Sequence, residues 1–137
     1  MKYLLDTNIL SELIKKQPNP HLISRLASKP PQSIFTSCIC VMELRFGSAL
    51  RKDFESFWVR IGDEILSRVT ILPLEHDDAL TAGDILATLQ RTGKPIGMED
   101  VLIASTALRY QCTLVTANTR HFCNIRELAV ENWLEPL

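Results

Sequence analysis

Short apolar runs alternate along this chain with longer stretches of helical periodicity, and this alternation is the feature that most limits its possible folds. The apolar runs predict four strands, at residues 3–5, 33–36, 69–72 and 113–116. The stretches between them carry apolar residues three and four positions apart, which predicts helices over residues 9–16, 21–28, 37–49, 53–67, 77–91 and 99–110. This order predicts an α/β fold with helices on both faces of a central, mostly parallel sheet of four to five strands.

The length of the chain is that of one folding unit. We expect residues 1–137 to form a single domain around one core. The 15 Lys and Arg residues balance the 16 Asp and Glu residues, so the formal net charge of −1 neither indicates nor excludes a polyanionic partner. The sequence has no apolar stretch long enough for a membrane span and no signal peptide, so we expect a cytoplasmic protein with no membrane association.

The cysteine pattern predicts reduced thiols and no disulfides. Cys38, Cys40, Cys112 and Cys123 contain no C-x-x-C pair, and the first two lie in an apolar segment. A zinc site formed by Cys112, His121 and Cys123 is the alternative interpretation. The spacing of these three residues matches no common zinc-binding pattern, so the alternative has little support.

Three carboxylates adjoin apolar segments that lie far apart in the sequence. Asp6 follows the first predicted strand, Glu43 lies within an apolar helical segment, and Asp100 precedes the apolar run of the last predicted helix. A buried carboxylate is costly unless it is paired or bound to a cation, so three acids placed against the core suggest a shared metal ion. Ligands that offer only oxygen atoms favour Mg²⁺ or Mn²⁺, which commonly assist phosphate chemistry.

Each acid also has a purely structural interpretation. Asp6, together with Thr7, could be only an N-cap of the first helix, for which Thr7 and Asn8 are also possible caps. Asp100 could likewise cap its own helix. For Glu43 the alternative is a surface acid paired with Arg45 or Arg51.

Four segments of the chain occur in the order and at the spacing of a known family. They are Leu5-Asp6-Thr7-Asn8, VMELRFG at 41–47, PIGMEDVLIA at 95–104 and LVTANTRHF at 114–122. Together they resemble the PIN-domain ribonucleases and, within them, the VapC toxins of VapBC toxin–antitoxin modules, over residues 3–133. The resemblance implies a PIN-like three-layer α/β/α fold. It also implies that Asp6, Glu43 and Asp100 bind the metal and that Asn8 and Thr116 support the site through hydrogen bonds.

One position departs from the family pattern. Many PIN domains carry a fourth acid where this chain has Asn118, whose amide oxygen can bind a divalent ion but brings no charge. We therefore expect a second metal ion, if one binds, to bind more weakly. Glu99 is not expected to compensate, because it points about 100° away from Asp100 on a helix and suits a solvated first turn. Arg120 and His121 are candidates for contact with RNA, with a solvated loop as the alternative.

The function implied by the resemblance is an endoribonuclease that depends on Mg²⁺ or Mn²⁺ and acts as the toxin of a toxin–antitoxin module. A metal-activated water would hydrolyse the phosphodiester, and the sequence shows no Ser-His-Asp or Cys-His arrangement for nucleophilic catalysis. The expected substrate is a tRNA, including the initiator tRNA cut near its anticodon stem-loop. Cleavage there would inhibit translation and arrest growth. The alternatives are a non-catalytic PIN module that binds RNA or a protein, and a flap-type DNA nuclease, for which this chain is too short.

The resemblance also implies two protein partners. The first is a small VapB-type antitoxin, whose cationic side chain is expected to occupy the acidic site. The second is another copy of the chain. A homodimer is also suggested by an apolar stripe that we expect to be too large for a small domain to bury alone, formed by Phe54, Phe57, Trp58, Ile61 and Ile65.

Overall fold

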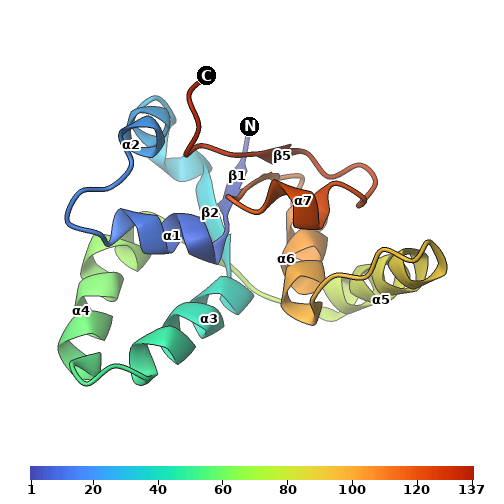
Figure 1. The fold of residues 1–137 in the computed structure, drawn as a ribbon, viewed down its shortest axis with the longest axis horizontal. Helices are drawn as coiled ribbons and strands as arrows, with labels where there is room; N and C mark the ends of the chain where they lie inside the picture. The colour runs from blue at the N-terminus through green and yellow to red at the C-terminus, as the bar shows by residue number, and fades with distance from the viewer.

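Five strands form one parallel sheet in the computed structural model, which describes all residues from Met1 to Leu137 (Figure 1). The strands are β1 (Tyr3–Leu5), β2 (Ile34–Ser37), β3 (Thr70–Leu72), β4 (Thr113–Val115) and β5 (Val130–Glu131). Their order across the sheet is β3-β2-β1-β4-β5, and every neighbouring pair is parallel. The predicted parallel sheet is confirmed. Only β5 was not predicted as a strand, because two residues carry no periodic pattern.

Seven α-helices flank the sheet. They are α1 (Thr7–Leu13), α2 (Pro20–Ala27), α3 (Cys38–Ala49), α4 (Phe54–Glu64), α5 (His76–Arg91), α6 (Met98–Arg109) and α7 (Thr119–Phe122). Two short 3₁₀ turns span Pro31–Ser33 and Leu66–Arg68. Helices lie on both sides of the sheet in Figure 1, so the predicted three-layer α/β/α architecture is confirmed. The predicted helix over 53–67 is shorter than expected, because the chain tightens into the second 3₁₀ turn after Glu64.

The first helix begins earlier than the sequence predicted. Asp6 is its N-cap residue, with extended backbone angles and a side chain that accepts a hydrogen bond from the Thr7 N–H at 2.8 Å. The expectation that Thr7 and Asn8 cap this helix is therefore wrong, and the capping role considered for Asp6 is confirmed. Because β1 ends at Leu5 and α1 starts at Thr7, the Asp6 carboxylate is fixed at the carboxyl end of the central strand.

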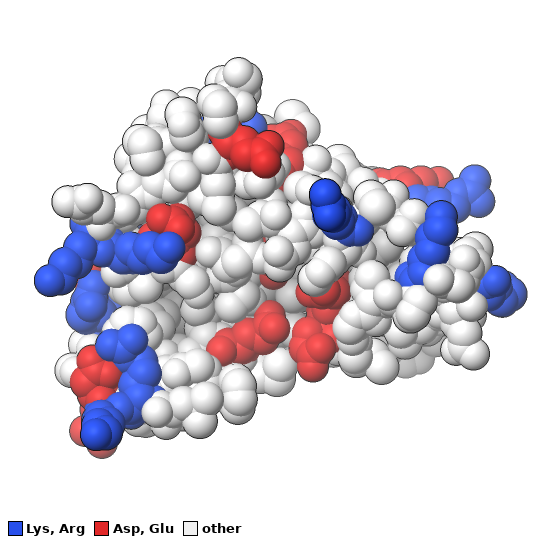
Figure 2. Space-filling view, viewed as in Figure 1, with Lys and Arg blue, Asp and Glu red and all other residues white.

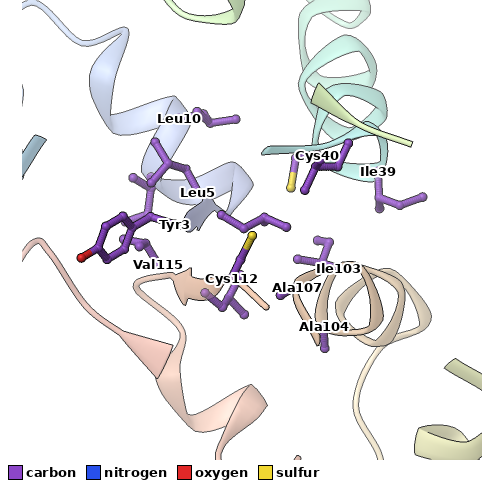
Figure 3. Close-up of a cluster of buried hydrophobic side chains, with 14 of the residues drawn as sticks. Tyr3, Leu5, Leu10, Ile39, Cys40, Ile103, Ala104, Ala107, Cys112 and Val115 are labelled. Atoms are coloured by element: carbon purple, nitrogen blue, oxygen red, sulfur yellow. The ribbon is translucent and has the colours of Figure 1, made fainter. Parts of the chain in front are cut away.

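The core forms one connected cluster of 25 buried apolar residues. The central strands β1 and β4 lie at its middle, and both are buried along their whole length. Figure 3 shows buried side chains on both sides of these strands. Tyr3, Leu5 and Val115 lie on one side, near Leu10 of α1, and the labelled side chains of α3 and α6 lie on the other, namely Ile39, Cys40, Ile103, Ala104 and Ala107. Burial of this kind fixes the positions of α3 and α6 relative to the sheet.

The apolar stripe of α4 is only partly buried within the chain. Ile61 and Ile65 are 2% and 3% exposed, whereas Phe54, Phe57 and Trp58 are half-buried, the last two packed against the core. The single domain therefore buries only part of the stripe, in line with the expectation that the stripe is too large for it to bury alone. Periodicity showed that α4 has one apolar face, but it did not show that α3 and the core cover part of that face.

None of the helices is both long enough and apolar enough to cross a membrane. All four cysteines are free thiols, as the sequence predicted.

Candidate metal centre

The strand topology brings the three predicted acids toward one edge of the sheet. Asp6 follows the central strand β1, α3 with Glu43 follows β2, and α6 with Asp100 in its first turn precedes β4. β1 lies between β2 and β4, so the three acids flank a single strand end. Figure 2 shows acidic side chains gathered near the middle of one face, over the region of α3 and the start of α6.

Asp6 is held by hydrogen bonds from three neighbours. It is 4% exposed, and its Oδ2 accepts bonds from the Thr116 hydroxyl at 2.8 Å and from the Asn8 amide at 3.2 Å. The Thr7 N–H binds Oδ1, and the Asn8 oxygen accepts the Ala117 N–H at 3.0 Å. The structure thus places both predicted supporting residues, Asn8 and Thr116, in contact with Asp6. These bonds tie the start of α1 to the end of β4 and fix the orientation of the carboxylate.

Glu43 is oriented by a residue that the sequence patterns did not indicate. The Thr7 hydroxyl donates a hydrogen bond of 2.6 Å to Glu43 Oε1, across 36 positions of sequence. The alternative of a surface ion pair for Glu43 is wrong, because Arg51 pairs with Asp53 and Arg45 makes no ion pair with Glu43. Thr7 therefore donates to both acids, to Asp6 through its backbone N–H and to Glu43 through its hydroxyl.

Asp100 contacts a histidine from another element. His121 of α7 places its Nδ1 3.0 Å from Asp100 Oδ2. The N-cap of α6 is Gly97, so the interpretation of Asp100 as a helix cap is wrong. Glu99 is exposed, as predicted. His121 was predicted only as a possible RNA contact, and its position beside an acid 21 residues away required the packing of α7 against α6.

Asn118 lies next to this hydrogen-bond network without using its side chain. Its backbone N–H donates to Thr116 Oγ1 at 3.0 Å, while its amide group forms no hydrogen bond and the residue is exposed. Arg120 is also exposed and makes no ion pair. A role in metal binding for Asn118 and a role in RNA contact for Arg120 stay predictions.

The electrostatics of the site favour a cation. Burial is the main cause that raises the pKa of Asp6, and the charge of Asp100 raises it further against the opposing hydrogen bonds. Burial also raises the pKa of Glu43, with additional contributions from Asp6, Asp100 and Glu99. No Lys or Arg side chain pairs with Asp6, Glu43 or Asp100. A divalent ion would offset this unpaired negative charge.

The donor atoms suit a hard ion. Ligand atoms of Asp6, Cys40 and Glu43 lie within 4.8 Å of one another, and no other group of three potential metal ligands is this compact. The zinc alternative with Cys112, His121 and Cys123 is therefore wrong. Burial, followed by the charge of Asp6, raises the pKa of the Cys40 thiol to about 12, so this thiol stays protonated. The carboxylate oxygens remain as the effective donors, which Mg²⁺ and Mn²⁺ prefer.

Cys40 was assigned to the core from its sequence, and it is indeed buried. It also lies three residues before Glu43 on the same helix, which places both side chains on one face of α3. That spacing is the signal that could have drawn attention to it.

The raised pKa values predict how pH changes the stability of the metal-free protein. Because folding raises the pKa of Asp6 and Glu43, the folded state binds protons more readily than the unfolded state. The free energy of unfolding should rise as pH falls through the folded-state pKa values, and the gain should be complete below the unfolded values. Replacing Glu43 with Gln keeps the acceptor for Thr7 and removes one of the charges.

We therefore expect Glu43→Gln to raise the melting temperature in EDTA at a pH above the folded-state pKa of Glu43, with a gain that shrinks as pH falls through that pKa. Thermal unfolding followed by circular dichroism measures this difference, with Glu135→Gln as the control at an exposed acid. A gain that grows toward low pH would contradict the assignment.

Comparison with known proteins agrees with the geometry of the site. The PIN domain family matches residues 3–128. Ribonuclease VapC2 from Haemophilus influenzae is 35% identical over 134 residues, which cover 98% of this chain and 99% of the relative. FitAcB from Neisseria gonorrhoeae superimposes with a TM-score of 0.88 and 32% identity, over 98% of this chain and 99% of the other.

A further solved structure that is similar to this chain also contains DNA. VapBC2 from Rickettsia felis, bound to a DNA fragment from its promoter, gives a TM-score of 0.86 and 33% identity, with 97% of this chain and 99% of the other covered. The family resemblance carried by the four sequence motifs is thus confirmed by the whole chain and by its fold. The chain belongs to the PIN domain family and, within it, to the VapC group.

Proposed function

We propose that this protein is a Mg²⁺- or Mn²⁺-dependent endoribonuclease that acts in the cytoplasm as the toxin of a type II toxin–antitoxin module. The observation that carries the proposal is the set of three acids around the end of β1, none of which pairs with a Lys or Arg. The similarity to ribonuclease VapC2 over nearly the whole chain supports it. The proposed substrate is a tRNA, including the initiator tRNA at its anticodon stem-loop, whose cleavage would stop translation.

Some residues of the site would bind the ion, and others position the residues that bind it. Asp6, Glu43 and Asp100 would hold the ion, which when bound supplies an activated water and charge for the scissile phosphate. Thr116 and Asn8 hold Asp6, and their bonds favour its charged form.

The proposal is tested with purified protein and isolated bacterial tRNA. Cleavage is expected with Mg²⁺ or Mn²⁺ and is expected to stop in excess EDTA. Sequencing of the new RNA 5′ ends after induced expression identifies the substrate and the position of the cut. A protein that binds tRNA but leaves it intact with either ion would instead support the non-catalytic alternative.

We also propose a small antitoxin partner of the VapB type. The solved structures of FitAcB and of VapBC2 are both complexes in which a chain similar to this one occurs. Because none of the three acids pairs with a Lys or Arg of this chain, an Arg or Lys of the partner could take the place of the metal charge. Expression of this chain alone should arrest growth, and co-expression of the adjacent small open reading frame should restore it. The proposal loses its support if no adjacent small protein neutralises the arrest.

The surface of α3 supports a homodimer. Met42, Phe46 and Leu50 are 50%, 68% and 73% exposed and recur every four residues, so they form one apolar strip on the helix that carries Glu43. We predict that light scattering gives about twice the monomer mass of 15.5 kDa, and that Phe46→Glu yields monomers because it places a charge in the contact. The exposed Val59→Glu change on α4 is the control. A wild-type mass of 15.5 kDa at micromolar concentration would exclude the dimer.

Asn118 offers a direct test of how many ions bind. Three carboxylates supply about three negative charges, so one Mg²⁺ leaves little charge for a second ion. We expect the free protein to bind one ion or none with measurable affinity. Asn118→Asp adds a charge at nearly the same volume, and it should tighten a second ion and lower the Mn²⁺ concentration for half-maximal cleavage.

Calorimetric titration with Mn²⁺ measures the binding, alongside cleavage of tRNA. The matched control is Asn124→Asp, which adds the same charge at an exposed position beyond α7. Two tightly bound ions in the wild type, or an unchanged metal requirement in Asn118→Asp, would place Asn118 outside the site.

A further inference from the structure

Four cations lie outside every ion pair on the side of the molecule formed by α5, α7 and the loops that follow these helices. They are Arg91, Lys94, Arg120 and Arg126, and all four are exposed. Figure 2 shows Lys and Arg side chains over α7 and over the α5 side, on the same face as the acids of the metal centre. Unpaired cations beside an acidic catalytic site suit a polyanion that extends beyond the reacting phosphate.

A cavity of about 140 Å³ opens between α5 and the segment after α7. Its lining includes Asp84, Ile85 and Thr88 from α5, and Asn124, Ile125 and Arg126 from that segment. A cavity of roughly 150 Å³ accommodates an aromatic ring such as benzene. The isoleucine side chains offer apolar contacts to the faces of a ring, while the carboxylate, hydroxyl and amide groups offer hydrogen bonds to its edge. This combination suits an unstacked nucleobase.

The cavity and the metal centre are connected by a short piece of chain. His121 contacts Asp100, and Ile125 lines the cavity only four residues later. Four residues span at most about 14 Å, which corresponds to about four nucleotides at the 3.4 Å rise of a stacked strand. An RNA strand with one phosphate at the acids can therefore cross α7, where Arg120 lies, and reach the cavity.

We propose that this surface binds the single-stranded RNA next to the cleaved bond, with one unstacked base in the cavity and the four cations on the phosphates. The inference rests on the proposed ribonuclease function and adds the path of its substrate. Asp84 accepts hydrogen bonds but cannot donate them, so it selects a base that presents an amino group, and it repels phosphate from the cavity. The base in the cavity lies within about four nucleotides of the cut.

Binding is measured by fluorescence anisotropy with a short, labelled, single-stranded RNA of mixed sequence, in EDTA so that no RNA is cut. The double variant Arg120→Gln/Arg126→Gln should weaken binding about tenfold at low salt. It should also reduce the slope of log affinity against log salt by about 1.4, since each phosphate contact on a single strand contributes about 0.7. The matched control Lys16→Gln/Lys52→Gln removes two exposed cations from the connections that follow α1 and precede α4, and it should leave both quantities nearly unchanged. Equal losses in the two double variants, or none in either, would overturn the proposed surface.

The base is tested through the choice of cleavage sites with Mg²⁺ present. Sequenced 5′ ends from the wild type should show a preference for an amino-bearing base at one position within about four nucleotides of the cut. Thr88→Phe fills the cavity without a change of charge, so it should abolish the preference, whereas Ala87→Phe, on the neighbouring exposed position of α5, should retain it. Asp84→Asn leaves the cavity open and should shift the preference.

The outcomes separate the two levels of the hypothesis. If the wild type cleaves RNA but Thr88→Phe and Asp84→Asn keep its base preference, the cavity assignment is wrong and the ribonuclease function stands. If the wild type cleaves no RNA with either ion, the proposed function is wrong. The anisotropy measurement, which does not depend on cleavage, then still tests whether this surface binds RNA.

Discussion

Substitution of Asp100 by Asn is expected to lower RNA cleavage by about 10³-fold or more and to abolish growth arrest. Even partners that merely orient a metal ligand contribute about 10- to 100-fold, so loss of a ligand charge should cost more. Asp6→Asn should have the same effect on cleavage. Both changes preserve side-chain volume, so the fold should persist. Cleavage of tRNA under single-turnover conditions gives the rate, and circular dichroism establishes that each variant is folded.

The neighbouring acid provides the control. Glu99 occupies the same first turn of α6, is exposed and forms no ion pair with the site, so Glu99→Gln removes only a solvated charge and should change the rate by only a few-fold. Full cleavage by a folded Asp6→Asn/Asp100→Asn double variant would contradict the assignment of these acids. A large loss in Glu99→Gln would show that total charge matters more than the positions of the ligands.

Replacement of Arg109 by Met is expected to lower the melting temperature by about 10 °C. Asp78 of α5 has no exposed surface, and its Oδ2 accepts bonds from Arg109 at 3.0 Å and from the Glu75 N–H at 2.8 Å. Its Oδ1 has no hydrogen-bond partner, so Arg109 is the only cation that offsets this buried charge. Loss of one partner of such a pair leaves the other charge uncompensated, which is strongly destabilising.

An exposed Arg–carboxylate ion pair serves as the control for the loss of melting temperature in Arg109→Met. Arg60 and Glu64 of α4 lie 2.9 Å apart with both side chains 51% exposed, so Arg60→Met should shift the melting temperature by less than about 2 °C. A second substitution, Asp78→Leu, should recover part of the loss in Arg109→Met, because it removes the buried charge. Equal shifts in the two Met variants would show that the Asp78 pair does not hold α5 against α6.

The sequence by itself determined the elements and their order. Strand and helix patterns depend on residues a few positions apart, so the alternation along the chain was sufficient to predict the parallel sheet and its flanking helices. The same local patterns placed Asp6 after a strand and Glu43 and Asp100 on helices. Parallel topology requires these segments to approach one edge of the sheet, which is why the sequence alone supports a single shared site for the three acids.

Sequence patterns did not predict the burial of a side chain where that burial depends on which other helix or strand packs against it. The stripe of α4 was recognised as apolar, yet only the packed fold showed that the core covers its Ile61 and Ile65 and that a more exposed apolar strip lies on α3. Asp78 gave no signal, because an acid in the first turn of a helix is ordinarily solvated. Its burial beneath Arg109 follows from the packing of α5 against α6.

The details of the metal centre were decided by tertiary structure for the same reason. The contacts of Thr7 with Glu43 and of His121 with Asp100 join residues 36 and 21 positions apart. Each contact requires two helices to be set at a particular distance and rotation, and these quantities result from the packing of the whole core. The sequence therefore determined which acids face the end of the central strand. Only the tertiary structure decided which side chains hold them there, because helix packing is a property of the assembled core and not of any one segment.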